Sequence, residues 1–259
     1  MNQIKIIPFN KARVHVGRWL LHLNKVESTN SLALNDPELL KKDGLVILAD
    51  IQTKGRGRKA RNWISHIPGN LYFSCTIHDN TASPIISTIP LIAGISLHHA
   101  LTEIGVPCVS IKWPNDILIK GRKVAGILVE AKSEKRLTTI VVGIGLNIRG
   151  TLEDYPNDLQ EKITTLEREG INNVDKMYLL SLILDHLDRQ ISDYIVKGSS
   201  YIYSKWESLS SSIGKKVIVT CNDSAISGDI VGLSRKGFLL IKADNGNVIE
   251  IVDGDVKFV

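Results

Sequence analysis

Two short segments carry most of the residues in this sequence that could do chemistry. The first is Lys112-Trp113-Pro114-Asn115-Asp116, which Lys123 and the apolar residues 124–129 follow. The second is residues 54–61, here called the cationic loop, which has five cations, glycines at positions 55 and 57 and no acidic residue. Such a loop beside strands that carry Lys, Asn and Asp suits a highly anionic ligand. A nucleoside triphosphate that reacts with a carboxylate is one such ligand.

Both segments also have a simpler structural explanation. The cationic loop could be a solvated turn, but its glycine spacing allows close ligand approach and Trp63 could stack on a base. Residues 112–116 could be an edge strand that ends in a turn. Against this, Asp116 lies between apolar stretches, where an unpaired carboxylate would be costly. Lys123 begins an apolar run, so its ammonium needs an anionic partner.

Other motifs are less specific. Gly55-x-Gly57-x-x-Ala60 matches the dinucleotide-binding pattern, yet residues 61–70 lack the apolar periodicity of the helix that should follow. Gly143-x-Gly145-x-Asn147 closes an apolar run, either as a bulge and turn or as backbone that admits a ligand. We find no P-loop, no paired-histidine metal motif and no Ser-His-Asp arrangement, so neither a metal centre nor a covalent nucleophile is predicted.

Composition narrows the class of protein. The 259 residues are 43% hydrophobic and 23% charged, which is ordinary for a soluble globular protein. A net charge of +5 favours anionic partners but is modest for a dedicated nucleic-acid binder. Three cysteines without metal-ligand spacing fit a reducing compartment. No signal peptide or membrane-length apolar run is present, so a cytoplasmic location is expected.

The pattern of apolar residues predicts an α+β fold with a mixed or antiparallel sheet. Strands are expected at residues 19–26, 45–51, 70–77, 109–113, 117–119, 123–131 and 137–146. Helical segments are expected at 31–40, after Ser28 or Thr29 as the cap, at 85–104, and in a helical arm that Asp175 caps and residue 212 closes. Beyond Ile213, glycines punctuate short β-runs and Asn245-Gly246 predicts a hairpin. We therefore expect two domains, 1–212 and 213–259.

Four motifs in order resemble the biotin protein ligase family. They are Glu27-Ser28-Thr29-Asn30, Gln52-Thr53-Lys54-Gly55-Arg56-Gly57-Arg58, Lys112 to Asp116 with Lys123-x-x-Gly126-Ile127-Leu128-Val129-Glu130, and Gly143-x-Gly145-x-Asn147. The resemblance covers about residues 19–259 and implies a class II synthetase-like catalytic domain with an SH3-like C-terminal β-barrel. It departs from the family at Ala60, where a glycine is common. No helix-turn-helix domain is expected ahead of the catalytic part, which implies the ligase-only type.

The family resemblance implies a two-step reaction with Mg²⁺ and ATP. Biotin becomes biotinyl-AMP, and a lysine of a biotin carboxyl carrier domain then accepts the biotinyl group. The implied catalytic residues are Lys123, Arg58 and Asp116, the last of which would orient or deprotonate the lysine. The implied biotin site is Ser28, Thr29, Asn30, Gln52, Gly55, Arg56, Gly57, Arg58, Lys123, Gly126 and Gly145. The implied ATP site is Arg56, Arg58, Arg61, Trp63, Asn115, Lys123 and Asn147.

Further expectations concern the mobility of the cationic loop, alternative functions, binding partners and the oligomeric state. The cationic loop should be mobile without ligand, because its five cations repel one another and it holds no internal counter-charge. Alternative functions are lipoate or octanoyl ligation on the same fold, or non-enzymatic nucleic-acid binding. Neither DNA nor a membrane is an expected partner. The sequence does not fix the oligomeric state, and a homodimer is one alternative.

Overall fold

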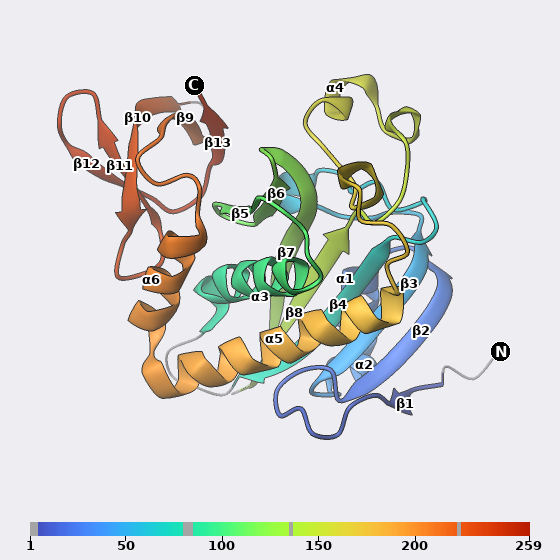
Figure 1. Ribbon diagram of the computed structural model, residues 1–259. Helices are drawn as coiled ribbons and strands as arrows, with labels where there is room; N and C mark the ends of the chain where they lie inside the picture. The colour runs from blue at the N-terminus through green and yellow to red at the C-terminus, as the bar shows by residue number, and fades with distance from the viewer. Residues whose placement is uncertain (1–4, 80–84, 135–136, 222–223) are drawn as a thin grey trace.

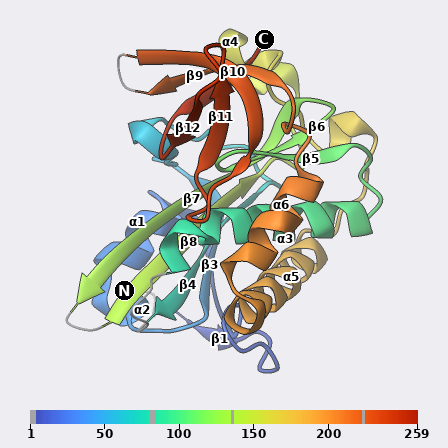
Figure 2. The same ribbon diagram turned by 90° about the vertical axis from the view of Figure 1, so that its left-hand side faces the viewer.

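The computed structural model describes residues 5–79, 85–134, 137–221 and 224–259, which form two β-sheets with helices around the larger one (Figures 1 and 2). The larger sheet has the strand order β1-β2-β3-β4-β8-β7-β6-β5. Its strands are β1 (Ile7–Pro8), β2 (Trp19–Val26), β3 (Leu45–Gln52), β4 (Leu71–Asp79), β5 (Val109–Lys112), β6 (Asp116–Ile119), β7 (Arg122–Glu134) and β8 (Leu137–Leu146). Strands β2 and β3 are parallel, and the other neighbouring pairs are antiparallel. The predicted mixed sheet is confirmed.

Strand β3 is buried on both faces of the sheet over most of its length, as its nearly continuous apolar run predicts. Alternate residues of a strand point to opposite faces. Leu45 and Ile47 join one hydrophobic cluster with residues of α1 (Thr29–Asn35) and α2 (Pro37–Leu40). Val46 and Leu48 join the main core with α3 (Ile89–Glu103) and α5 (Lys176–Lys197). In Figure 1, α3 and α5 lie on the near face of the sheet and α1 on the far face.

Local signals explain where the helices begin and end. Ser28 caps α1 by accepting a hydrogen bond from the Ser31 N–H (3.4 Å), and Asp175 caps α5 as predicted. Helix α3 begins later than expected, because Ile85–Ser87 form a 3₁₀ turn. Gly198 (φ +79°) separates α5 from α6 (Ser199–Leu209), so the predicted helical arm is two helices. None of the helices in the described ranges is long and apolar enough to cross a lipid bilayer.

The smaller sheet is the predicted C-terminal β-module. Its five antiparallel strands are β9 (Lys216–Cys221), β10 (Ser224–Leu233), β11 (Leu239–Ala243), β12 (Val248–Ile251) and β13 (Asp255–Phe258), in the order β12-β11-β10-β9-β13. Gly246 has φ +85° in the turn between β11 and β12, which confirms the Asn-Gly hairpin. This arrangement is compatible with an SH3-like module. Figure 2 shows it above the end of α6 and beside β5 and β6.

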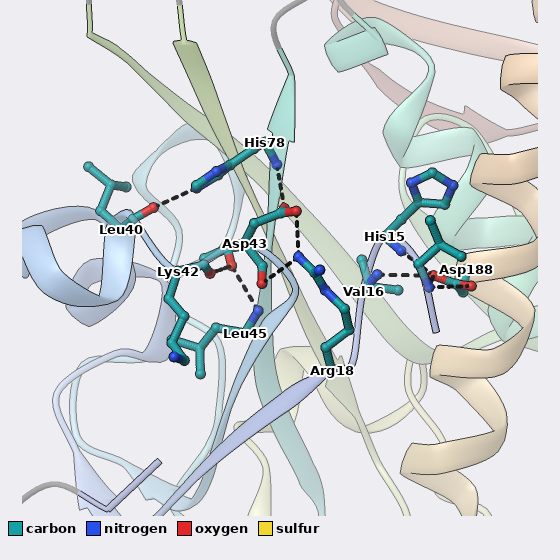
Figure 3. Close-up of polar contacts among 11 residues, drawn as sticks. His15, Val16, Arg18, Leu40, Lys42, Asp43, Leu45, His78 and Asp188 are labelled. Carbon is teal, nitrogen blue, oxygen red and sulfur yellow. Dashed lines mark hydrogen bonds and ion pairs between the residues drawn. The ribbon is translucent and has the colours of Figure 1, made fainter. Parts of the chain in front are cut away.

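Two partly exposed carboxylates, those of Asp43 and Asp188, fix the chain as it enters the large sheet (Figure 3). Asp188 of α5 accepts hydrogen bonds from the backbone N–H of His15 (2.6 Å) and Val16 (3.1 Å). Asp43, which precedes β3, accepts from the Arg18 guanidinium (2.6 Å) and from the backbone N–H of His78 (2.9 Å). These contacts hold the start of β2 between α5 and β3. Strand β3 ends at Gln52, which lies in the candidate site.

Candidate active site

A cavity of about 350 Å³ lies where β7 and β8 meet the cationic loop, the turn between β5 and β6, and the C-terminal module. This volume is within the range of small-molecule sites. The predicted site residues that line it are Ser28, Thr29, Asn30, Gln52, Arg56, Gly57, Arg58, Arg61, Trp63, Asn115, Asp116, Lys123, Gly126, Gly145 and Asn147. Gly55 lines an adjoining depression instead, and a Cβ there would lie 2.1 Å from the Ser65 Oγ. Gly55 is therefore required by packing within the loop.

One end of the cavity is a buried polar network at the start of α1. The side-chain Oε1 of Gln52 accepts hydrogen bonds from the Thr29 backbone N–H (2.8 Å) and hydroxyl (3.1 Å). The Ser74 hydroxyl lies 2.6 Å from both Thr29 Oγ1 and Asn30 Oδ1, and Asn30 Nδ2 donates to Glu130 (3.0 Å). Because buried polar groups are costly unless bonded, this network fixes the side-chain orientations before any ligand arrives.

Trp63 covers the strands beside this network, and the glycines opposite it explain how. Gly126 of β7 and Gly145 of β8 are paired directly across the strands. A Cβ at Gly145 would lie 2.3 Å from the Trp63 Nε1, and one at Gly126 would lie 2.8 Å from its ring. The two glycines were predicted to admit biotin. In the structure they make room for the indole of Trp63, which itself lines the cavity, and no described residue accepts a hydrogen bond from its buried Nε1.

Lys123 and Asp116 form an ion pair in the cavity wall. The Lys123 Nζ lies 2.6 Å from the Asp116 Oδ1, without the angular geometry of a hydrogen bond, and 5.1 Å from the centre of the Trp63 ring. Lys123 and Asp116 were each expected to need an oppositely charged partner, and each is the partner of the other. Asp116 reaches Lys123 across the β6–β7 pairing.

The cationic loop is held by acidic residues from outside it. Lys54 pairs with Glu27 (2.8 Å) and Arg56 with Glu130 (2.8 Å). The other three cations pair with the C-terminal module: Arg58 with Asp253, Lys59 with Asp253 (3.8 Å) and Asp255 (3.5 Å), and Arg61 with Asp255. The loop does lack an internal counter-charge, as predicted, but its charges are compensated all the same. Repulsion among unbalanced cations therefore gives no ground for expecting a mobile loop.

Backbone bonds close the loop as well. The Gly57 N–H donates to the Arg61 carbonyl (2.7 Å), and the Trp63 N–H donates to the Gly55 carbonyl (3.0 Å). At the tip, Lys59 (φ +53°) and Ala60 (φ +57°) are both left-handed. This explains why a glycine is favoured at position 60, since an L-residue there is strained by about 1–2 kcal/mol.

The two predicted asparagines bind backbone on opposite sides of Lys123. Asn115 donates to the Ile127 carbonyl (2.7 Å) and accepts from the Arg58 guanidinium (3.1 Å), so it holds the arginine at the cavity. Asn147 donates to the Thr164 carbonyl (3.3 Å). Its buried Oδ1 has no partner among the described residues and lies in the cavity lining, where it could accept from a ligand.

Several residues of the site were not predicted from sequence. Ser74 is a polar residue inside a buried apolar strand, and only the contrast with its neighbours could have indicated it from the sequence. Lys112 also lines the cavity, where burial and, secondarily, Lys123 lower its pKa against the opposing effect of Asp116 and Asp255. Nothing local could have indicated Asp255, because it lies 194 residues from its partner Arg61. Tyr155 completes the wall, and burial raises its pKa to about 12.

Comparison with known proteins gives this fold and cavity a family. A model of the biotin/lipoate A/B protein ligase family matches residues 23–147, and a model of the biotin protein ligase C-terminal domain matches residues 212–259. The two matches fall on the large sheet and on the C-terminal module. They define the class as that of the biotin and lipoate ligases.

Individual relatives make the assignment narrower. The bifunctional ligase/repressor BirA of Escherichia coli K12 is 32% identical over 222 residues, which are 85% of this chain and 68% of that protein. The biotin–[acetyl-CoA-carboxylase] ligase of Paracoccus denitrificans is 27% identical over 88% of this chain and 95% of that protein. The biotin protein ligase of Aquifex aeolicus, solved with biotin and ATP, superposes with a TM-score of 0.78 at 31% identity, covering 93% of this chain and 98% of that one. The chain belongs to the biotin protein ligase family.

Proposed function

We propose that this chain is an ATP-dependent biotin–protein ligase that joins biotin to a lysine of a biotin carboxyl carrier domain. The observation that carries this function is the meeting, in one cavity, of a preformed polar network and several cations. The network at Thr29, Asn30 and Gln52 suits a neutral polar ring, and the cations at Arg58 and Lys123 suit phosphates. The biotin and ATP complex of the Aquifex aeolicus relative supports this pairing of ligands.

Biotin would bind with its ureido ring at the polar network. The ring offers two N–H donors and a carbonyl acceptor, and Ser28, Thr29, Asn30 and Gln52 provide both hydroxyls and amides. Trp63 would cover its apolar part, since the indole lines the cavity next to the network. The biotin carboxylate would then point along β7 toward Lys123.

In the first step, a biotin carboxylate oxygen attacks the α-phosphorus of ATP. A carbon–oxygen–phosphorus linkage forms, the bond from the α-phosphorus to the bridging oxygen breaks, and pyrophosphate leaves with that oxygen. Two anions must approach each other, so fixed cations are needed where charge accumulates. Lys123 and Arg58 supply them. Lys123 would exchange Asp116 for the α-phosphate, and Arg58 would exchange Asp253 for a ligand oxygen.

In the second step, a neutral lysine amine of the carrier domain attacks the biotinyl carbonyl. An amide bond forms, AMP leaves and the amine loses a proton. Once the phosphate holds Lys123, the Asp116 carboxylate is free to orient the amine or to accept that proton. Ion-pair exchange at Lys123 thus links the two steps, because adenylate formation prepares the acid–base group for transfer.

Mg²⁺ is expected to accompany the ATP phosphates. Among the described residues, no cluster of three or more His, Cys, Asp and Glu side chains could hold a metal ion. This arrangement fits a metal that binds mainly through phosphates, with a protein carboxylate such as Asp255. When bound, Mg²⁺ would offset the charge of the leaving pyrophosphate. We also propose a cytoplasmic location.

Transfer to an isolated carrier domain tests this function. The protein is incubated with Mg·ATP, a carrier domain and either biotin or lipoate, and the carrier is analysed by intact-mass spectrometry. We expect addition of one biotinyl group and no reaction with lipoate. Modification by lipoate alone would assign the chain to the lipoate branch of the fold. No modification by either acid, with salt-dependent binding of nucleic acid, would support the non-enzymatic alternative.

A further inference from the structure

The backbone of Lys123 is fixed by a segment that does not belong to its sheet. At this point β7 is irregular: Ile117 pairs with Ala125 but Leu118 pairs with Lys123, so Val124 is an extra residue. The Lys123 N–H donates to the Lys162 carbonyl (2.8 Å), and the Lys123 carbonyl accepts from the Thr164 N–H (2.9 Å). The direction of the Lys123 side chain therefore depends on residues 162–164.

One buried carboxylate ties this segment to the strand that carries Lys123. The Glu169 side chain is 1% exposed. Its Oε1 accepts from the Thr164 hydroxyl (2.6 Å) and from the Arg122 guanidinium (2.6 Å), and its Oε2 pairs with the Lys120 ammonium (2.9 Å). Thr164 belongs to residues 162–164, which bind the backbone of Lys123, and Arg122 directly precedes Lys123. The carboxylate thus joins both sides of the Lys123 backbone contact.

The charge of Glu169 is stabilised where it lies. Burial acts to raise its pKa, but the hydrogen bond from Thr164 and the cations Lys120 and Arg122 together hold the pKa below the ordinary value. Partners on both oxygens stabilise a buried carboxylate only if the geometry of their contacts is well fixed. The hydroxyl of Thr164 is itself fully buried, so water does not compete for this bond.

We propose that Glu169 is a positioning residue for Lys123. Its carboxylate holds Thr164 against Arg122, and this contact sets the backbone of Lys123 and the place of its ammonium in the cavity. Glu169 touches no reacting atom. The effect of Glu169 on catalysis rests on the proposed function. Its effect on the Lys123 backbone does not, because that effect depends only on the hydrogen bonds that join Glu169, Thr164 and Arg122.

Thr164→Val is the sharpest test, because it removes the tie and leaves Glu169 with both cations. Thr165→Val is the matched control: Thr165 is also fully buried, but its hydroxyl accepts only from the Arg168 N–H (3.2 Å) among the described contacts. Thr164→Val should lower the rate of biotin-dependent pyrophosphate release about tenfold to a hundredfold, with little change in KM for biotin, since small misplacements of a catalytic group cost this much. Thr165→Val should stay near the wild-type rate.

Two further readouts separate positioning from general destabilisation. Amide hydrogen exchange at Lys123 should accelerate in Thr164→Val and in Glu169→Gln, but not in Thr165→Val. In a Lys123→Met background, Thr164→Val should cause no further loss of rate, because the two changes act through one group. Equal exchange in Thr164→Val and the control, or full additivity with Lys123→Met, would overturn the proposal. If the wild type releases no pyrophosphate with biotin, the proposed function fails and the exchange result alone decides whether Glu169 positions the Lys123 backbone.

Discussion

At the scale of residues, the pairing of Lys123 with Asp116 determines what each can do before a ligand binds. The pair is partly exposed, with 30% of the Lys123 side chain and 22% of the Asp116 side chain accessible, so its net stabilisation is small. An anionic α-phosphate oxygen can therefore displace the carboxylate at modest cost. In the proposed reaction both side chains would act, and neither is held so tightly that exchange would be slow.

Replacing Lys123 by methionine should nearly abolish adenylate formation while the protein remains folded. A fixed cation at the reacting phosphate acts mainly in the transition state, and groups of this kind contribute about two to three orders of magnitude in rate. Pyrophosphate release with biotin and Mg·ATP measures the effect. Lys132→Met is the matched control, because Lys132 lies on the same strand and pairs with Glu134 away from the cavity. Near-normal release by Lys123→Met would remove Lys123 from the catalytic residues.

Asp116→Asn should separate the two half-reactions. The amide keeps the shape of the carboxylate but cannot accept the proton of the attacking amine, so transfer should fall about a hundredfold. Adenylate formation should change little, because Lys123 is then free of its counter-ion. Single-turnover assays that follow bound biotinyl-AMP and biotinylated carrier measure each step. A parallel loss in both would instead place Asp116 in ATP or Mg²⁺ binding.

The sequence was most informative at this scale. The motif residues gather around one cavity because the sheet order brings together the strands and loops that carry them and the start of α1, and the contrast of these residues with their apolar neighbours is visible in the sequence. The role of the glycines was not visible, because Gly126 and Gly145 make room for Trp63, some sixty and eighty residues earlier in the chain. Contacts of that kind depend on strand register, which the sequence did not specify.

At the scale of elements, apolar periodicity and caps predicted the strands and helices well. The break at Gly198 was missed, because a single glycine inside a long helical pattern is often tolerated. The parallel pair β2–β3 was also left open, since alternation alone does not give strand direction. The later start of α3 follows from a 3₁₀ turn at Ile85–Ser87, for which the sequence has no distinct signal.

The packing of α3 against α5 and α6 should weaken in mild acid. The pKa of His99 on α3 is lowered to about 4, first by burial and then by the nearby charges of Lys205, His98, His186 and Arg189. His186 in turn binds Glu103 (2.9 Å). A histidine whose pKa falls on folding stabilises the native state above its unfolded pKa of about 6.5 and loses this contribution as pH falls toward the folded value.

His99→Gln should therefore flatten the pH dependence of unfolding between about pH 6.5 and 4. Allowing for solvent screening of this partly exposed group, the wild type should lose about 1 kcal/mol more than the variant over this range. Urea unfolding at several pH values gives the comparison, with His22→Gln as a control at the exposed ion pair between β2 and Asp50 of β3. Parallel curves for wild type and His99→Gln would show that His99 does not contribute.

At the scale of the whole molecule, the C-terminal module takes part in the site. Gly254, Asp255 and Val256 line the cavity, and Asp253 and Asp255 hold three cations of the cationic loop. The sequence predicted the module but not this contact, because 194 residues separate Asp255 from Arg61 and neither carries a local signal for the other. We infer that the module places the loop over the cavity until phosphates take over its cations.

Changing Asp253 and Asp255 together to asparagine should loosen the loop without unfolding the module. Protease cleavage within residues 54–61 should become faster in the ligand-free protein, and biotin with Mg·ATP should restore protection, because phosphates then hold the same cations. Asp244→Asn is the control, since Asp244 pairs with Lys216 (2.9 Å) inside the module. Unchanged cleavage in the double variant would show that the backbone bonds and the ion pairs with Glu27 and Glu130 hold the loop without the module.

The central claim, that this cavity activates a carboxylate with ATP, is tested most directly by identifying the bound product. The protein is incubated with biotin and Mg·ATP, separated from free small molecules, denatured, and its ligand analysed by mass spectrometry. We predict biotinyl-AMP in a near-stoichiometric amount from the wild type and at least a tenfold lower rate of accumulation in Lys123→Met. Unmodified biotin and ATP recovered from a folded wild-type protein, or equal adenylate from both proteins, would contradict this account.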